Sequence, residues 1–153
     1  MTLEYLADRP DFINTIAQWY FDEWGNRMTD NNLTKEIENV KLYLNKDKIP
    51  LIIVATDGAE LLGVAQLKFR EMDMYPEKEH WLGGVYVSPA HRGKNIAVQM
   101  IGKIIALAKT LGVKKLYLQT IRLDGGLYAR LGWQPIEQVF NNGQDVLVME
   151  RDF

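Results

Sequence analysis

The residues from Arg92 to Ala97 have the composition of a loop that holds a phosphorylated ligand. They read Arg-Gly-Lys-Asn-Ile-Ala and lie between a predicted strand and a predicted long helix. The first turn of a helix leaves backbone N–H groups unpaired and carries partial positive charge, so it can bind phosphate or pyrophosphate. Gly93 lets the backbone approach such a ligand closely, and Arg92 and Lys94 add formal positive charge. The alternative is a basic turn that only precedes a core helix.

Residue types that are absent or rare exclude several other chemistries. The chain has no cysteine, which excludes disulfides, thiolate metal sites and an acyl-cysteine intermediate. Its only histidines are His80 and His91, too few for a histidine-based metal cluster, so we expect no metal. The only serine, Ser88, precedes Pro89 and lacks a Gly-x-Ser-x-Gly elbow, which disfavours a serine hydrolase. Neither a Walker loop nor a Gly-x-Gly-x-x-Gly motif is present.

The overall composition is that of one globular domain. Of the 153 residues, 47 % are hydrophobic and 25 % are charged, and no repeat or linker interrupts them. The net charge of −2 lacks the positive excess of a nucleic-acid-binding protein. No apolar run approaches the roughly 20 residues that span a membrane, and no signal peptide is visible. We therefore predict a single domain over residues 1–153 that is cytoplasmic and binds neither nucleic acid nor membrane.

Periodic patterns predict the elements that position the loop. Apolar residues at helical spacing predict one helix that follows Pro10, a second that begins near Leu33, and a third that contains Ala97 to Ala108. Asp8 is the expected N-cap of the first helix. Strands are predicted at residues 2–6, 51–55, 61–70, 81–87, 115–119, 133–140 and 145–151, with a short helix at about 125–131.

The order of these elements predicts the fold class. Along the chain it is β-α-α-β-β-β-α-β-α-β-β, an α/β arrangement with a mixed sheet. Gly83 and Gly84 interrupt the strand at 81–87, which favours a β-bulge or a close backbone approach there.

Two motifs resemble those of the GCN5-related N-acetyltransferase (GNAT) superfamily. The loop is similar to the family's cofactor motif Gln/Arg-x-x-Gly-x-Gly/Ala, with Arg92 at the first position and Ala97 at the last. Asn95 stands where the family most often has glycine, and asparagine tolerates left-handed backbone better than other non-glycine residues. Residues 127–133, Leu-Tyr-Ala-Arg-Leu-Gly-Trp, resemble the family's Leu-Tyr-x-x-Leu-Gly-Phe segment. The resemblance covers about residues 50–150 and implies a mostly antiparallel central sheet flanked by helices.

The resemblance implies acetyl-CoA as acyl donor and roles for particular residues. The backbone of Val85 and Val87 would hydrogen-bond the pantetheine arm as an added strand does. Tyr128 would lie near the thioester sulfur and protonate the leaving thiolate, and its alternative is a core aromatic. The pyrophosphate would be held by Arg92, Gly93, Lys94, Asn95, Ile96 and Ala97.

An amine acceptor calls for a general base. Alkyl amines are protonated at neutral pH and must lose a proton before they attack a thioester, so a base or a water chain that leads to one is expected. Counting by two along the strand from Val87 puts Glu79 on the same face, whereas one bulge at Gly83-Gly84 would put His80 there instead. Glu79 and His80 are therefore the candidate bases, and the alternative for each is an ordinary exposed residue.

The segment Trp19–Trp24 is the candidate acceptor surface. In members of the family this region helps to form the acceptor cleft, and aromatic faces with carboxylates suit a cationic amine. The alternative places Tyr20 and Trp24 in the core, with Asp22 and Glu23 solvated.

The sequence thus predicts an N-acetyltransferase that moves an acetyl group from acetyl-CoA to a primary amine of a small molecule or peptide. Without a cysteine nucleophile, we expect direct attack in a ternary complex. A noncatalytic acyl-CoA-binding sensor is the alternative, and a nucleotide-binding domain that uses the same helix start is a third. The sequence leaves open which amine is the acceptor and whether the chain forms a homodimer.

Overall fold

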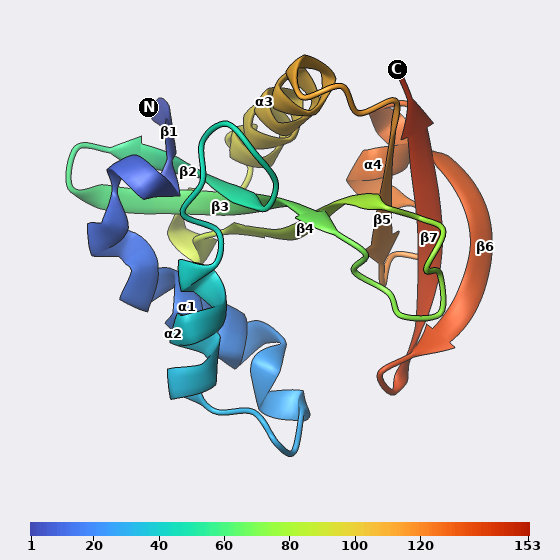
Figure 1. Cartoon of the computed structure of the whole chain (residues 1–153), viewed down its shortest axis with the longest axis horizontal. Coiled ribbons are helices and arrows are strands. Elements are labelled where there is room, and N and C mark those ends of the chain that lie inside the picture. The colour runs from blue at the N-terminus through green and yellow to red at the C-terminus, as the bar shows by residue number, and fades with distance from the viewer.

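Seven strands form one sheet in the order β1-β2-β3-β4-β5-β7-β6 (Figure 1). The computed structural model describes residues 1–153, and every neighbouring pair of strands is antiparallel except β4 and β5. The predicted element order and the mixed, mostly antiparallel sheet are confirmed. The elements are β1 (Thr2–Tyr5), α1 (Ile13–Glu23), α2 (Leu33–Lys41), β2 (Leu51–Asp57), β3 (Glu60–Phe69), β4 (His80–Val87), α3 (Ile96–Thr110), β5 (Lys115–Thr120), α4 (Gly126–Arg130), β6 (Gln134–Asn141) and β7 (Gln144–Asp152).

Helices cover both faces of the sheet. Helices α1 and α2 pack on one face and α3 packs on the other (Figure 1). Side chains of β2 alternate between the two cores, because successive residues of a strand point to opposite faces. Ile52 and Val54 pack toward α1, whereas Leu51, Ile53 and Ala55 pack toward α3. None of the helices has both the length and the apolar character needed to cross a membrane.

The start of α1 differs from the prediction. The α-helix begins at Ile13, after a 3-10 turn at Pro10–Phe12, and no side chain caps its N-terminus. This extra turn separates Asp8 from the helix, so the predicted N-cap is wrong. The carboxylate of Asp8 instead forms an ion pair with Lys46 at 2.7 Å.

The predicted bulge is present in β4. Gln66 of β3 pairs with Gly83 and Val64 pairs with Tyr86, so β4 has one more residue than β3 between the two pairs. Gly84 lies at this bulge with φ of +54°, a left-handed conformation that favours glycine. A Cβ at this glycine would lie 2.6 Å from a tyrosine hydroxyl of α1. Both the backbone conformation and the close approach of α1 therefore require glycine here.

Strands β4 and β5 are paired over a very short stretch and then diverge. Trp81 and Tyr117 are their only register pair, and the two strands run parallel. Beyond this pair, β4 has no strand partner on its β5 side as it runs toward Val87. The sheet is therefore open between its two halves, directly before the loop that leads into α3.

Candidate active site

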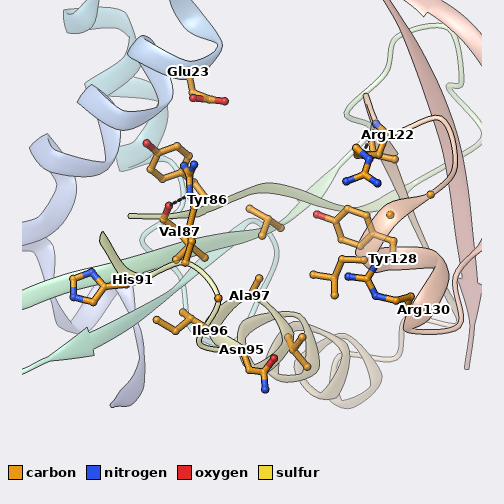
Figure 2. A pocket seen from close by; sticks show the side chains of 18 of the residues that line it. Glu23, Tyr86, Val87, His91, Asn95, Ile96, Ala97, Arg122, Tyr128 and Arg130 are labelled. Atoms are coloured by element: carbon orange, nitrogen blue, oxygen red, sulfur yellow. Dashed lines mark hydrogen bonds between the residues drawn. The ribbon is translucent and has the colours of Figure 1, made fainter. Parts of the chain in front are cut away.

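A cleft of about 550 Å³ lies at the opening between β4 and β5. Its walls come from β4, the start of α3, the end of β5 and α4, with Glu23 and Trp24 from the end of α1. Figure 2 shows Tyr86 and Val87 on one side of the cleft, Ile96 and Ala97 at the start of α3, and Tyr128 on the other side. The volume is within the range of ligand-binding sites, about 300–1,000 Å³.

The loop before α3 has a backbone that suits a bound anion. Gly93 and Asn95 have φ of +81° and +61°, so asparagine adopts the left-handed conformation at this position. A Cβ at Gly93 would meet no atom within 4 Å. Helix α3 begins at Ile96 without a side-chain cap, which leaves the N–H groups of its first turn for a ligand. Lys94 is exposed and lies outside the lining of the cleft.

The charge of the lining is positive. The lining contains three arginines, Arg92, Arg122 and Arg130. It contains one carboxylate, that of Glu23. The Arg92 Nε donates a hydrogen bond to the Val87 carbonyl oxygen at 3.0 Å, and its guanidinium lies 5.3 Å from the centroid of the Tyr86 ring. Arg92 is therefore held at the end of β4, and the surplus positive charge favours an anionic ligand.

Val85 and Val87 line the cleft on the open side of β4. Their backbone groups belong to the part of the strand that pairs with no neighbour toward β5. A strand edge of this kind can pair with an extended ligand through main-chain hydrogen bonds. The Val87 carbonyl already accepts the bond from Arg92, which leaves one of its two lone pairs.

Tyr128 projects from α4 into the cleft (Figure 2). Helix α4 follows Gly125, which has φ of +84°, and the Asp124 carboxylate accepts a hydrogen bond from the first N–H of the helix at 2.9 Å. The tyrosine ring lies edge-on to Trp133, with ring centroids 6.2 Å apart. Burial, followed by the charge of Glu71, raises the pKa of Tyr128 to about 12, so the phenol keeps its proton at neutral pH.

Glu79 and His80 lie outside the lining of this cleft. The bulge does shift the strand by one residue, so His80 rather than Glu79 shares a face with Val87. His80 is nevertheless at the far end of β4, where its ring packs 5.5 Å from that of Phe69. The Glu79 carboxylate pairs with Arg70 at 3.4 Å, and its other oxygen lies 3.2 Å from the His80 Nε2. The structure brings neither candidate base to the opening between β4 and β5.

A smaller cavity of about 170 Å³, the polar chamber, adjoins the cleft. Trp24 lines both cavities, and Gly84 of the chamber directly precedes Val85 of the cleft. The chamber lies between α1, α2 and the end of β3. Its lining includes Tyr43, Glu36, Lys68 and Glu71.

Glu71 is the residue of this region that sequence analysis missed. It follows β3 through Arg70, whose φ of +37° turns the chain back toward β4. Its carboxylate occupies space above Gly83, where an added Cβ would lie 2.5 Å from the Glu71 Oε1. Gln119 Nε2 donates to Oε2 at 3.1 Å, and Lys68 Nζ lies 3.8 Å from Oε1. No spacing in the sequence indicates this approach, because it depends on three strands meeting.

The Trp19–Trp24 segment divides between the core and the site. Tyr20 is buried, and its hydroxyl donates to the Gly84 carbonyl at 2.8 Å. Trp24 is 41 % exposed and lines both the cleft and the polar chamber. Trp19 packs on Tyr86 with ring centroids 5.1 Å apart. The core prediction therefore holds for Tyr20, which also lines the polar chamber, whereas Trp24 is exposed and lines both cavities.

Comparison with known proteins identifies the family. The model of the acetyltransferase (GNAT) family matches residues 11–133, which include the loop before α3 and the segment around Tyr128. The chain therefore belongs to the GNAT acetyltransferase family. A search of curated protein sequences found no match.

Solved structures of acetyltransferases share the fold. Aminoglycoside 6'-acetyltransferase type Ii gives a TM-score of 0.75 at 18 % identity, covering 99 % of this chain and 97 % of that chain. An aminoglycoside 6'-N-acetyltransferase complexed with coenzyme A gives a TM-score of 0.74 at 15 % identity, with the same coverage of both chains. A ribosomal-protein-alanine N-acetyltransferase from Brucella melitensis gives a TM-score of 0.71 at 18 % identity, and the match covers 100 % of both chains. At these identities the similarity establishes the fold alone.

Proposed function

We propose that this chain transfers the acetyl group of acetyl-CoA to a primary amine of a small molecule or peptide by direct attack in a ternary complex. The observation that carries the proposal is the cleft between β4 and β5. It combines an uncapped helix start, an unpaired strand edge and a protonated tyrosine in one cavity. We further propose that residues 1–153 act as one domain, because β1 and β6 are the two edges of the same sheet.

The features of the cleft fit the chemical groups of the donor in order. The pyrophosphate is placed at the loop from Arg92 to Ala97, where first-turn N–H groups and arginine charge meet an anion. The pantetheine amides are placed along Val85 and Val87, as a short added strand. Lys94 contributes only longer-range charge, since it lies outside the lining.

The thioester is then placed near Tyr128. The amine nitrogen attacks the thioester carbonyl carbon, and the carbon–sulfur bond breaks as the intermediate collapses. Tyr128 gives its proton to the departing thiolate, and its pKa of about 12 ensures that the proton is present at neutral pH. The raised pKa also makes the phenol a weaker acid, so its contribution comes mainly from position.

The test is release of free thiol from acetyl-CoA in the presence of a panel of primary amines. We expect thiol release that depends on both the protein and the amine, together with a rise in melting temperature on addition of coenzyme A. Stabilisation by coenzyme A without turnover of any amine would favour the noncatalytic sensor. Stabilisation by mononucleotides but not by coenzyme A would favour a nucleotide-binding domain.

A further inference from the structure

The polar chamber and the cleft carry opposite charge. The chamber has two carboxylates, Glu36 and Glu71, against the single ammonium of Lys68, whereas the cleft has a surplus of arginine. Aromatic rings of Trp24 and Tyr43 complete the chamber wall. A cavity with surplus negative charge and aromatic faces favours a cation. The two cavities therefore suit different halves of one reaction, an anionic donor and a cationic acceptor.

We propose that the polar chamber receives the ammonium group of the acceptor, that Glu71 binds it and takes its proton, and that the acceptor is a primary alkylamine that carries positive charge and no carboxylate. The inference rests on the proposed acetyl transfer and specifies its acceptor side.

The carboxylate of Glu71 is fixed at the boundary between the chamber and the opening in the sheet. Gln119 of β5 donates to it at 3.1 Å, and Asn141 Nδ2 donates to the Gln119 oxygen at 3.2 Å, which orients the amide. Because Gly83 has no side chain, the carboxylate can lie directly against β4. Glu71 thus bridges from the end of β3 to β5, across the place where β4 and β5 separate.

Tyr128 lies within electrostatic reach of the same carboxylate. The charge of Glu71 is one of the two causes that raise the pKa of Tyr128. Glu71 belongs to the lining of the chamber and Tyr128 to that of the cleft. A thioester placed between them would have a proton acceptor on the amine side and a proton donor on the sulfur side.

The chamber has room for the ammonium end of an alkylamine. Its volume of about 170 Å³ is several times the roughly 30 Å³ that one water molecule occupies in the liquid. A longer stem would continue out of the chamber.

The protons balance in this scheme. The ammonium gives one proton to the Glu71 carboxylate and attacks as the neutral amine. The nitrogen loses a second proton as the amide forms. The thiolate takes one proton from Tyr128, which regains a proton as the site returns to its starting state. Two protons thus leave the nitrogen for every turnover. One of them is balanced by the thiol of coenzyme A, and the other reaches solvent through Glu71.

The surroundings of Glu71 set the direction of its titration. Burial raises the pKa of Glu71, and the charge of Lys68 with the hydrogen bond from Gln119 opposes this. The other titratable groups around the chamber are Glu36 and Tyr43 of α2 and Tyr20 of α1, with Tyr128 of α4 beyond it. The carboxylate therefore forms at a higher pH than an ordinary glutamate, and kcat/KM should rise as pH passes through this range.

The decisive variant is Glu71→Gln, with Glu77→Gln as the matched control at an exposed position. We expect Glu71→Gln to raise the KM for the amine at least 10-fold and to move the rising limb of the pH profile toward the pKa of the free amine, about 10. Stabilisation by coenzyme A should be unchanged, which shows that the fold and the donor site persist. Glu77→Gln should match the unmodified protein. An unchanged amine KM and pH profile in Glu71→Gln would overturn the inference.

A second variant displaces the carboxylate without removing it. A Cβ in Gly83→Ala would meet the Glu71 Oε1 at 2.5 Å, so the side chain must move away from β4. We expect a rise in the amine KM in the same direction as for Glu71→Gln, and no change in Gly102→Ala, whose Cβ meets nothing within 4 Å. An unaltered amine KM in Gly83→Ala would contradict the placement of Glu71.

The acceptor class is tested with n-butylamine and 4-aminobutanoate as probes, which share the ammonium group and the stem and differ in a terminal carboxylate. We expect kcat/KM for n-butylamine to exceed that for 4-aminobutanoate at least 10-fold, because the surplus negative charge of the chamber disfavours a further carboxylate. Equal rates for the two amines would overturn the proposed class. If no amine on the wider panel supports thiol release by the unmodified protein, the proposed function itself fails. Normal turnover by Glu71→Gln would sink only this inference.

Discussion

Tyr128 illustrates how local surroundings decide the chemistry of one side chain. Its ring packs on Trp133, and its hydroxyl end belongs to the lining of the cleft. The ring therefore packs as a core aromatic does, and the role of catalytic acid stays a prediction. A tyrosine with a pKa of about 12 is fully protonated at neutral pH, but it gives up its proton less readily than a free phenol. Positioning, rather than acidity, has to supply its contribution.

Tyr128→Phe should lower kcat by roughly 10- to 1000-fold, a range that includes the usual contribution of a general acid and a weaker one. The apparent affinity for coenzyme A should change little, since the ring still packs and only a hydroxyl is lost. Steady-state kinetics with n-butylamine and a coenzyme A titration measure the two quantities. Full kcat in the variant would assign the proton to water or to another residue. Weak cofactor binding with a lowered melting temperature would instead indicate a mainly structural tyrosine.

At the scale of elements, two local backbone conformations shape the site. Left-handed residues in the loop before α3 leave the first turn of the helix facing the cleft. The bulge of β4 places the Tyr20 hydroxyl against the Gly84 carbonyl and brings α1 close to the strand. Each conformation is tolerated because glycine or asparagine occupies the strained position. The two conformations should have separable effects, one on binding and one on stability.

Gly93→Asp should abolish the stabilisation by coenzyme A. The new carboxylate repels the pyrophosphate, and the φ of +81° disfavours any side chain there. The matched control is Gly143→Asp in the β6–β7 turn, because Gly143 has the same φ of +81° and its Cβ would also meet nothing within 4 Å. Thermal melts with and without coenzyme A separate strain, which is common to both variants, from loss of binding. An intact shift in Gly93→Asp would remove this loop from the donor site.

Gly84→Ala should destabilise the fold. The added Cβ would lie 2.6 Å from the Tyr20 hydroxyl, and the φ of +54° is unfavourable for alanine. We expect a loss of about 1–3 kcal/mol in the free energy of unfolding, which is typical of strain at such a position. Chemical denaturation measures it, and Gly102→Ala in α3 serves as the control. A Gly84→Ala protein as stable as this control would show that α1 does not depend on the bulge.

The whole molecule divides into two halves that meet at one opening. Strands β1 to β4 with α1 and α2 carry the polar chamber, and β5 to β7 with α4 carry Tyr128. Helix α3 connects them and supplies its N-terminus to the cleft. The two cavities share Trp24, so under the proposed assignment the donor and the acceptor are bound side by side. This arrangement favours direct transfer in a ternary complex over a covalent intermediate.

Direct transfer predicts that no acetylated protein forms as an intermediate. Incubation with acetyl-CoA alone should leave no acetyl group that later passes to an amine, because the chain has no cysteine and its one serine precedes a proline. Intact mass spectrometry and initial-rate patterns with both substrates varied test this. Intersecting rate lines are expected. Parallel lines, or an acetylated species that acetylates added amine, would refute direct attack.

Local patterns in the sequence were sufficient for the order of the elements and for the loop at the start of α3. Hydrophobic period, turn residues and helix signals act between residues that are close along the chain, so they can be read without a structure. The bulge at Gly83-Gly84 was predictable in the same way. The role of Asp8 could not be predicted in this way, because a 3-10 turn lies between it and the start of the α-helix.

Only the tertiary structure decided which side chains meet at the opening between β4 and β5. Counting along β4 predicted which face of the sheet Glu79 and His80 occupy. It did not predict their distance along the strand from the cleft, and both residues lie outside the lining. Glu71 reaches the site through a left-handed turn, an absent side chain at Gly83 and a hydrogen bond from Gln119. These contacts join three strands that are distant in sequence. The physical reason is that periodicity determines the direction of a side chain, whereas sheet order and register determine its neighbours.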